Sequence, residues 1–285
     1  MNQRHFSHIV PPDLHERQRL SNYIVGKFPF LETGSAAKKA IKKKQVLIDS
    51  RVGVTGDWVI AGTKLEYISQ FDEHHQVDPA INILYEDDHF LILNKPPGLL
   101  SSGNSSISLQ GMLKSYPTVD KEGALFYPYL VHRLDRQTCG LIIAARTIDA
   151  RRRLGEMVEN HQIIKRYSLI VEGHLENNIK YIDQPIDDRD AKTEILSITH
   201  LSTNDASSYI RVRLHSGRTH QIRRHFLGIG HPIVGDDIYN KEGLSFGRGL
   251  FLMADYLEFE HPITGSQVLM TVDLHGKFRK YLLRS

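Results

Sequence analysis

A single carboxylate stands between two cations where a polar loop enters an apolar segment. Asp135 lies between Arg133 and Arg136 in the stretch 131–140, and the run Leu-Ile-Ile-Ala-Ala follows at 141–145. A short run of branched and small apolar residues without polar alternation is typical of a strand covered on both faces. We therefore expect Asp135 at the mouth of a core strand. Its cationic neighbours leave two interpretations open: an ion pair that serves structure, or a carboxylate kept ionised for chemistry.

A tyrosine and an arginine are expected beside core elements further along the chain. Residues 163–171 alternate in the manner of a strand that carries Tyr167. A helix is expected to begin after a cap at Thr219 and to stop at Gly228. Arg223 lies at the edge of the buried seam of that helix, where its guanidinium can reach toward a buried carboxylate. Taken alone, Tyr167 is typical of a packed core aromatic.

The histidines and glycines do not form a known metal or nucleotide site. Four of the sixteen histidines cluster at His215, His220, His225 and His231, but they are spaced by five, five and six residues. A zinc helix instead places two histidines four residues apart. No glycine pattern matches a phosphate loop, and Ser101 lacks the elbow and base of a serine nucleophile. We expect no metal and no cofactor.

Composition indicates an ordinary globular protein. Of the 285 residues 40% are hydrophobic and 24% are charged, and the net charge is +3, so any nucleic-acid-binding surface must be local. The single cysteine, Cys139, cannot form an intramolecular disulfide, which fits a reducing compartment. The first residues lack a secretory signal, and no apolar run approaches the roughly 18 residues of a membrane helix. We expect a cytoplasmic protein that does not enter membranes.

Strands and helices are mixed along the chain without a repeating strand-helix-strand rhythm. This pattern favours an α+β domain with a mixed, mainly antiparallel sheet over residues 81–285. The remaining expected strands are 81–86, 90–94, 193–199, 208–214, 250–259 and 267–274, and the remaining helices are 109–114, 147–158 and 277–283.

The first 80 residues are expected to form a separate small unit. Residues 1–16 are predicted to be an unstructured arm, and the polar stretch 71–80 to be a linker. Between them, a helix is predicted at 19–28 and a second helix from an N-cap at Ser35, followed by strands at 46–49 and 64–68.

The second of these helices is predicted to be amphipathic and basic. Its apolar side is Ala37, Ala40 and Ile41, and its other side carries Lys38, Lys39, Lys42 and Lys43. From residue 38 to residue 51 there are six Lys or Arg against one Asp. Such a run is either a solvated face or a surface that binds phosphates by counterion release.

Taken together, these motifs resemble the RluA-type RNA pseudouridine synthases. The resemblance rests on 132–135 (His-Arg-Leu-Asp) with Thr138 and Gly140, on 165–167 (Lys-Arg-Tyr), on 217–223 (Gly-Arg-Thr-His-Gln-Ile-Arg), and on further family segments at 94–98, 231–236 and 261–265. Residues 17–70 resemble the small S4-like RNA-binding domain that precedes the catalytic domain in some members. Two departures are Cys139, where the family usually has serine, and the loop 100–104, which lacks a His-Pro pair.

The resemblance implies a reaction and a set of roles. The enzyme would isomerise uridine to pseudouridine in structured RNA, large-subunit ribosomal RNA first and transfer RNA second, as a monomer and without a cofactor. Asp135 would be the catalytic carboxylate, acting at C1′ or C2′ of the sugar, with Arg223 as its salt-bridge partner. Tyr167 would stack on the uracil, and Arg133 would fill the place of the flipped base. The four lysines would hold phosphates.

Two alternatives belong to other classes. A non-catalytic RNA-binding or chaperone protein could keep the fold, but the complete set of Asp135, Tyr167 and Arg223 argues against it. A glycosidase could use Asp135, but such enzymes commonly pair two acids, and no second acid lies nearby in the sequence.

Overall fold

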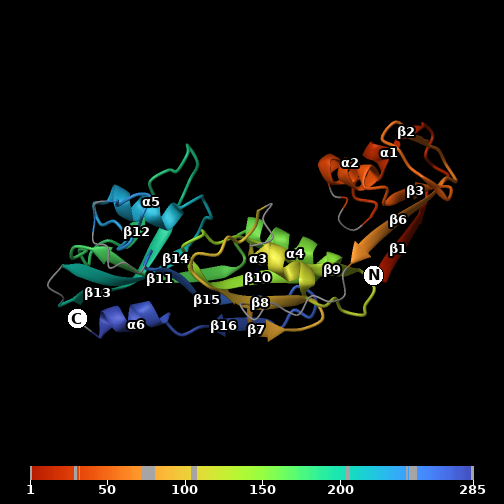
Figure 1. Cartoon of the computed structure of the whole chain (residues 1–285). Coiled ribbons are helices and arrows are strands. Elements are labelled where there is room, and N and C mark those ends of the chain that lie inside the picture. Colours follow the sequence, from red (N-terminus) through yellow and green to blue (C-terminus); the bar gives the residue numbers. More distant parts are fainter. Residues whose placement is uncertain are drawn as a thin grey trace. The chain divides into compact units, whose positions relative to one another are not determined.

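The computed structural model describes residues 2–28, 31, 33–71, 81–103, 108–202, 206–241, 243 and 249–283. The chain divides into two compact units, Met1–Gln76 and Val77–Ser285, and each is considered by itself (Figure 1). From residue 72 on, the predicted linker lies outside the described residues, so its structure stays a prediction. No helix among the described residues is long and apolar enough to span a membrane.

The N-terminal unit contains a four-stranded antiparallel sheet in the order β1-β6-β3-β4. Its strands are β1 (Asn2–Ile9), β6 (Lys64–Phe71), β3 (Val46–Ile48) and β4 (Arg51–Val52), and the short strands β2 (Gln18–Arg19) and β5 (Trp58–Val59) pair separately. The prediction of an unstructured arm at 1–16 is therefore wrong for residues 2–9. Phe6 packs on Tyr67, and His8 contacts the Tyr23 hydroxyl at 3.0 Å, so both point inward. A histidine at an inward position hid the alternation of this strand.

The two helices of this unit differ in detail from their predictions. Helix α1 (Leu20–Tyr23) is shorter than predicted: turns follow it, and the φ of +73° at Gly26 prevents a right-handed helix from continuing to residue 28. Helix α2 (Gly34–Lys42) is capped by Thr33 and not by Ser35, since the Thr33 hydroxyl accepts the backbone N–H of Ala36. Its apolar side, Ala37, Ala40 and Ile41, is buried as predicted.

The larger unit is built on a ten-stranded sheet in the order β12-β13-β14-β11-β15-β10-β8-β7, with β16 paired to β15 and β9 to β10. The strands are β7 (Asn82–Glu86), β8 (Phe90–Lys95), β9 (Ala124–Leu130), β10 (Cys139–Thr147), β11 (Ile164–Glu172), β12 (Tyr181–Ile182), β13 (Thr193–Leu201), β14 (Ser207–Leu214), β15 (Leu252–Glu260) and β16 (Gln267–Thr271). Only the β10–β15 pair is parallel among the described ladders, so the predicted mixed, mainly antiparallel α+β sheet is confirmed.

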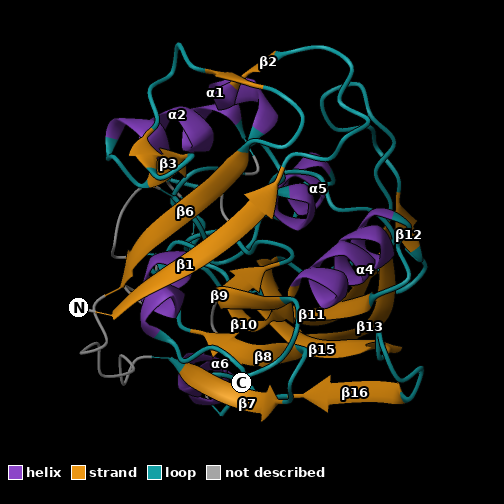
Figure 2. Ribbon diagram, turned by 90° about the vertical axis from the view of Figure 1, so that its right-hand side faces the viewer, coloured by secondary structure: helices purple, strands orange, loops and turns teal. Residues whose placement is uncertain are grey.

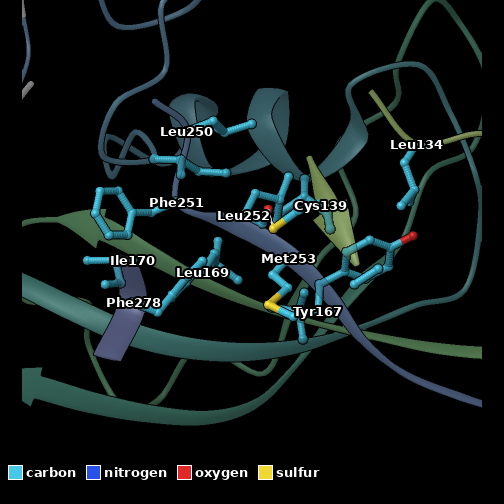
Figure 3. Close-up of a cluster of buried hydrophobic side chains, with 14 of the residues drawn as sticks. Leu134, Cys139, Tyr167, Leu169, Ile170, Leu250, Phe251, Leu252, Met253 and Phe278 are labelled. Atoms are coloured by element: carbon cyan, nitrogen blue, oxygen red, sulfur yellow. Dashed lines mark hydrogen bonds between the residues drawn. The ribbon is translucent and has the colours of Figure 1, made fainter. Parts of the chain in front are cut away.

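Strand β10 is buried along its whole length, as its apolar sequence predicts. Ile142 belongs to one hydrophobic core and Ile143 to another, because successive side chains point to opposite faces. Gly140 has a φ of +111°, and a Cβ there would collide with the backbone of Ala254 on β15. The glycine thus permits the close parallel approach directly behind the Asp135 loop. Figure 3 shows the core beside it, with Cys139, Leu252 and Met253 near Tyr167.

Helices cover both sides of the sheet (Figure 2). They are α3 (Leu109–Met112) with the 3-10 turn Leu113–Ser115, α4 (Ile148–Glu159), α5 (Gln221–Gly228) and α6 (Gly276–Leu282). Helix α4 agrees with the predicted range 147–158 to within one residue at each end and is capped by the Thr147 hydroxyl, and Ile148, directly after the cap, is exposed. Ile148 lies two residues before the buried Ala150, which is roughly 200° around a helix.

Candidate active site

The loop that carries Asp135 is fixed by hydrogen bonds to its own strand and to a second loop. The Nε2 atom of His132 accepts the backbone N–H of Ile143 at 3.2 Å. Burial, together with the charge of Lys165, lowers the pKa of His132 to about 3, so its imidazole is neutral. The Ser101 hydroxyl donates to the carbonyl oxygen of Leu134 at 2.6 Å and accepts the N–H of the same residue at 3.0 Å.

A fully buried lysine supports the other end of this loop. The ammonium of Lys95 donates to the carbonyl oxygens of Pro96, Leu99 and Arg136 at 3.0, 2.8 and 3.1 Å. Burial lowers the pKa of Lys95 to about 8, which leaves the ammonium form dominant at neutral pH. Gly98 and Arg136 add two further hydrogen bonds between the segments. The segment 94–98, singled out in the sequence without a role, is thus a support for the Asp135 loop.

Asp135 faces two basic side chains that come from distant sequence. Its Oδ2 atom lies 3.9 Å from Nη1 of Arg223, and its Oδ1 atom lies 3.7 Å from Nε2 of His220. Its side chain is 20% exposed, so it is open to a ligand. Arg133 is exposed, and Arg136 is directed to the carbonyl of Gly98. Within the described residues, neither sequence neighbour is an ion-pair partner of Asp135.

Arg223 comes from the first turn of α5 and is buried more deeply than an edge position predicts. Its side chain is 2% exposed, and its Nε and Nη2 atoms donate to the carboxylate of Asp236 at 2.7 and 2.6 Å. Burial alone would raise the pKa of Asp236, but the hydrogen bonds from Arg223 and the backbone hold it below its usual value. The direct partner of Arg223 is therefore Asp236, and Asp135 is approached by the remaining Nη1.

Tyr167 lies on β11 with its ring in the core and its phenol end toward the cavity. It is 7% exposed, and Figure 3 shows the phenol oxygen turned to the side where Leu134 lies. Burial, together with the charges of Asp135 and Asp255, raises the pKa of Tyr167 well above its usual value. The phenol is consequently neutral. Tyr167 is thus a core aromatic, as its sequence context alone predicts, that also lines a cavity.

These groups line one cavity of about 540 Å³, a volume within the range of small-molecule sites. Its wall is more basic than acidic. Lys165, on β11 two residues before Tyr167, also lines it, and burial lowers the pKa of this lysine. The lining residues are His132, Arg133, Leu134, Asp135, Thr138, Val158, Glu159, His161, Lys165, Tyr167, Leu214, Gly217, Arg218, Thr219, His220, Gln221, Ile222, Arg223 and Leu252.

The clustered histidines have separate partners. His215 contacts Glu194, His225 contacts Thr193 and the carbonyl of Gln184, and His231 contacts the carbonyl of Glu172. No group of three potential metal ligands is present among the described residues.

The N-terminus of α5 differs from its prediction. Thr219 does not cap the helix; His220 holds the N-cap position in a left-handed conformation with a φ of +55° and gives no side-chain cap. Gln221 instead fixes the preceding turn, since its amide oxygen accepts from the Ser216 hydroxyl and the Arg218 N–H. The sequence analysis did not identify His220 and Lys165 as cavity residues, although they lie in the family segments 217–223 and 165–167, respectively.

The predicted phosphate-binding lysines belong to the N-terminal unit. Lys38, Lys39, Lys42 and Lys43 are exposed on α2, and in the described part of the chain none of them forms an ion pair with a carboxylate.

Comparisons with known proteins identify the family of this chain. A family model described as RNA pseudouridylate synthase matches residues 89–227. The ribosomal large subunit pseudouridine synthase D of Buchnera aphidicola is 30% identical over 317 residues, covering 99% of both chains. The protein of the same name from Escherichia coli (strain K12) is 29% identical and covers 88% of this chain and 85% of its own. Among solved structures, human RNA pseudouridylate synthase domain containing 4 has a TM-score of 0.54 at 23% identity, over 71% of this chain and 92% of its own, which shows a shared fold.

Proposed function

Because the chain belongs to the RNA pseudouridine synthase family and is therefore an isomerase that converts uridine to pseudouridine in RNA, we propose that it modifies large-subunit ribosomal RNA. The relative that aligns over almost the whole chain carries that substrate in its name. The observation that carries the proposed site is the single cavity that gathers Asp135, Tyr167 and Arg223 from a loop, a strand and a helix.

The reaction exchanges one glycosidic bond for another. The bond between N1 of uracil and C1′ breaks, the base turns, C5 bonds to C1′, and the proton lost from C5 is balanced by one gained at N1. Asp135 supplies the carboxylate at the sugar, either by attack at C1′ or by removal of a proton from C2′. Deuterium at C2′ distinguishes the two routes, because it slows the reaction only where the C2′–H bond breaks.

The surrounding residues divide the remaining tasks. Arg223 stabilises the ionised form of Asp135, and its own fixed position comes from Asp236. The neutral phenol ring of Tyr167 stacks on the detached uracil and lies near its C5 atom. A carboxylate exposed by only 20% cannot reach a base that stays in a stem, so the uridine must flip out, at a cost of a few kcal/mol.

Arg133 is placed to compensate for that flipping. It is exposed, lines the cavity two residues before Asp135, and has no carboxylate partner within the described residues. A planar guanidinium can take the place of the vacated base between its neighbours. The exposed lysines Lys38, Lys39, Lys42 and Lys43 then bind flanking phosphates through the S4-like N-terminal unit.

In this proposal the protein acts as a monomer on structured RNA. The proposed location is the cytoplasm, where ribosomal RNA is exposed during assembly.

Mapping pseudouridines in RNA tests the substrate. Cells that lack this protein are compared with cells that carry the wild type or Asp135→Ala. We expect defined positions in large-subunit ribosomal RNA to lose pseudouridine without the protein, to regain it with the wild type, and to stay unmodified with Asp135→Ala. Restored modification by Asp135→Ala would refute the catalytic role. A change confined to transfer RNA would replace the proposed substrate by the second candidate.

A further inference from the structure

Asp135 has two basic neighbours, and neither of them is positioned by Asp135 itself. The contacts of 3.7 Å to His220 and 3.9 Å to Arg223 are longer than hydrogen bonds, which lie at about 2.7–3.2 Å. Other residues must therefore hold the side chains of His220 and Arg223 next to the carboxylate of Asp135. Both holding contacts come from one segment, residues 236–239.

Asp236 and Tyr239 provide these contacts. Asp236 binds Nε and Nη2 of Arg223, and its Oδ1 also accepts the backbone N–H of Ile238 and Tyr239 at 3.0 and 2.9 Å. The carboxylate that orients the arginine thus also shapes the turn that carries Tyr239. The hydroxyl of Tyr239 lies 3.0 Å from Nδ1 of His220, and its ring lies 5.2 Å from the guanidinium of Arg223.

The chemistry of the carboxylate selects one tautomer of His220. A carboxylate can only accept hydrogen bonds, so an unprotonated Nε2 facing Asp135 would set lone pair against lone pair. The favourable neutral form has the proton on Nε2, and Nδ1 then accepts from the Tyr239 hydroxyl. Tyr239 therefore directs an N–H toward Oδ1 of Asp135.

The backbone of His220 is consistent with a functional constraint. Its φ of +55° is in the left-handed region, which residues other than glycine rarely adopt. The side chain does not cap α5, so the conformation is not explained by a capping hydrogen bond. What it achieves is to direct the imidazole between Tyr239 and Asp135.

We propose that His220 is a second positioning residue for Asp135, and that Tyr239 acts through His220 by fixing its tautomer and direction. The torsion that orients a carboxylate plane is broad, so a donor on only one oxygen leaves the plane loosely defined. Arg223 at Oδ2 and His220 at Oδ1 hold the plane from both sides, and the two contacts shorten to hydrogen bonds in the RNA complex. This inference rests on the proposed role of Asp135.

Single-turnover kinetics on in vitro transcribed large-subunit ribosomal RNA, with a transfer RNA pool as a parallel substrate, test the proposal. We expect His220→Ala to lower the rate of the chemical step by on the order of 10²-fold and Tyr239→Phe by about tenfold, with RNA affinity unchanged. His220→Gln, which keeps an N–H donor, should recover part of the rate. Tyr256→Phe is the matched control, because that hydroxyl contacts Glu258 away from the cavity; it should leave the rate unchanged.

The double variant decides whether Tyr239 acts through His220. If it does, His220→Ala with Tyr239→Phe is no slower than His220→Ala alone. Multiplying losses would overturn the linkage, and an unchanged rate in His220→Ala would overturn the positioning role. Thermal unfolding midpoints of the variants are compared so that loss of folded protein is not counted as loss of rate. An Asp135→Ala arm separates the proposals: if that variant is active, the proposed function of Asp135 fails instead.

Discussion

The loop that carries Asp135 and the basic face of α2 are built in opposite ways. The loop is held by Ser101, His132 and the buried ammonium of Lys95, each through hydrogen bonds of 2.6–3.2 Å. The lysines of α2 are exposed, and in the part of the chain that the structure describes they pair with no carboxylate. Catalysis at one carbon atom of the sugar requires a fixed geometry. Binding to phosphates requires positive charges on side chains that can change conformation.

This contrast predicts effects of different kinds and sizes. A change in the loop or its supports should cause a large loss of rate or of stability, because its hydrogen bonds cannot be replaced. A change on α2 should affect affinity in small increments and only at moderate salt. Four experiments test this contrast, and they are given in order of decreasing expected effect.

Asp135→Asn should abolish isomerisation while leaving the fold and the RNA affinity intact. The substitution keeps the shape of the side chain but removes the negative charge that the sugar carbon requires. We expect a loss of at least about 10³-fold in the single-turnover rate, comparable to removal of an essential catalytic group. Pseudouridine formation and filter-binding affinity are measured on the same RNA. Turnover within tenfold of the wild type would show that the carboxylate is structural after all.

Lys95→Met should lower the free energy of unfolding by about 2 kcal/mol, because it leaves three carbonyl oxygens without their donor. The same substitution at the exposed Lys38 should change stability by less than about 0.5 kcal/mol. Urea unfolding of the two variants compares the two regions with one chemical change. Equal effects at both positions would contradict the distinction between the hydrogen-bonded Asp135 loop and the exposed lysines of α2.

The same pair of variants gives a pH test with a defined sign. The pKa of Lys95 is lowered to about 8 in the folded protein, against 10.5 for an ordinary lysine. Below pH 8 Lys95 is protonated in both the folded and the unfolded state. The full cost of burying its charge then lowers the free energy of unfolding. As pH rises from about 8 to 10.5, the folded state gives up this proton first, so wild-type stability should rise relative to Lys95→Met. A difference that stays constant across this range contradicts the lowered pKa.

The amino-acid sequence predicts the local elements of the site well, but it predicts poorly the contacts between residues that are distant in sequence. The apolar run behind Asp135 and the strand of Tyr167 follow from periodicity within a few residues, and both are confirmed. The pairing of Arg223 with Asp236 and the support from Lys95 depend on residues 13 and 41 positions away, respectively. Periodicity does not encode such pairs, and the family resemblance links Arg223 only to Asp135.

A histidine with a long-range hydrogen bond accounts for two further errors. His8 points inward from the N-terminal sheet, where it contacts Tyr23. This polar residue interrupts the apolar alternation of β1, so the sequence predicts an unstructured arm instead of a strand. His220 occupies the N-cap of α5 without capping it, whereas the sequence rule favours the hydroxyl of Thr219. In both cases a long-range hydrogen bond outweighs the local preference. The predicted roles of Asp135, Tyr167, Arg223 and Arg133 stay predictions, although all four side chains line one cavity.

The smallest expected effect concerns the basic face. Lys38→Glu combined with Lys42→Glu should weaken binding to structured RNA by roughly tenfold and flatten the dependence of log Kd on log salt by about 2, because each lost phosphate contact removes close to one released counterion. Arg279→Glu combined with Lys280→Glu, on α6, gives the same change in net charge at another exposed position. The chemical step at saturating RNA should be unchanged in both pairs, since neither touches the Asp135 loop. Equal weakening by the two pairs would mean that net charge alone attracts the RNA, and an unchanged salt slope in the α2 pair would mean that its lysines are only solvated.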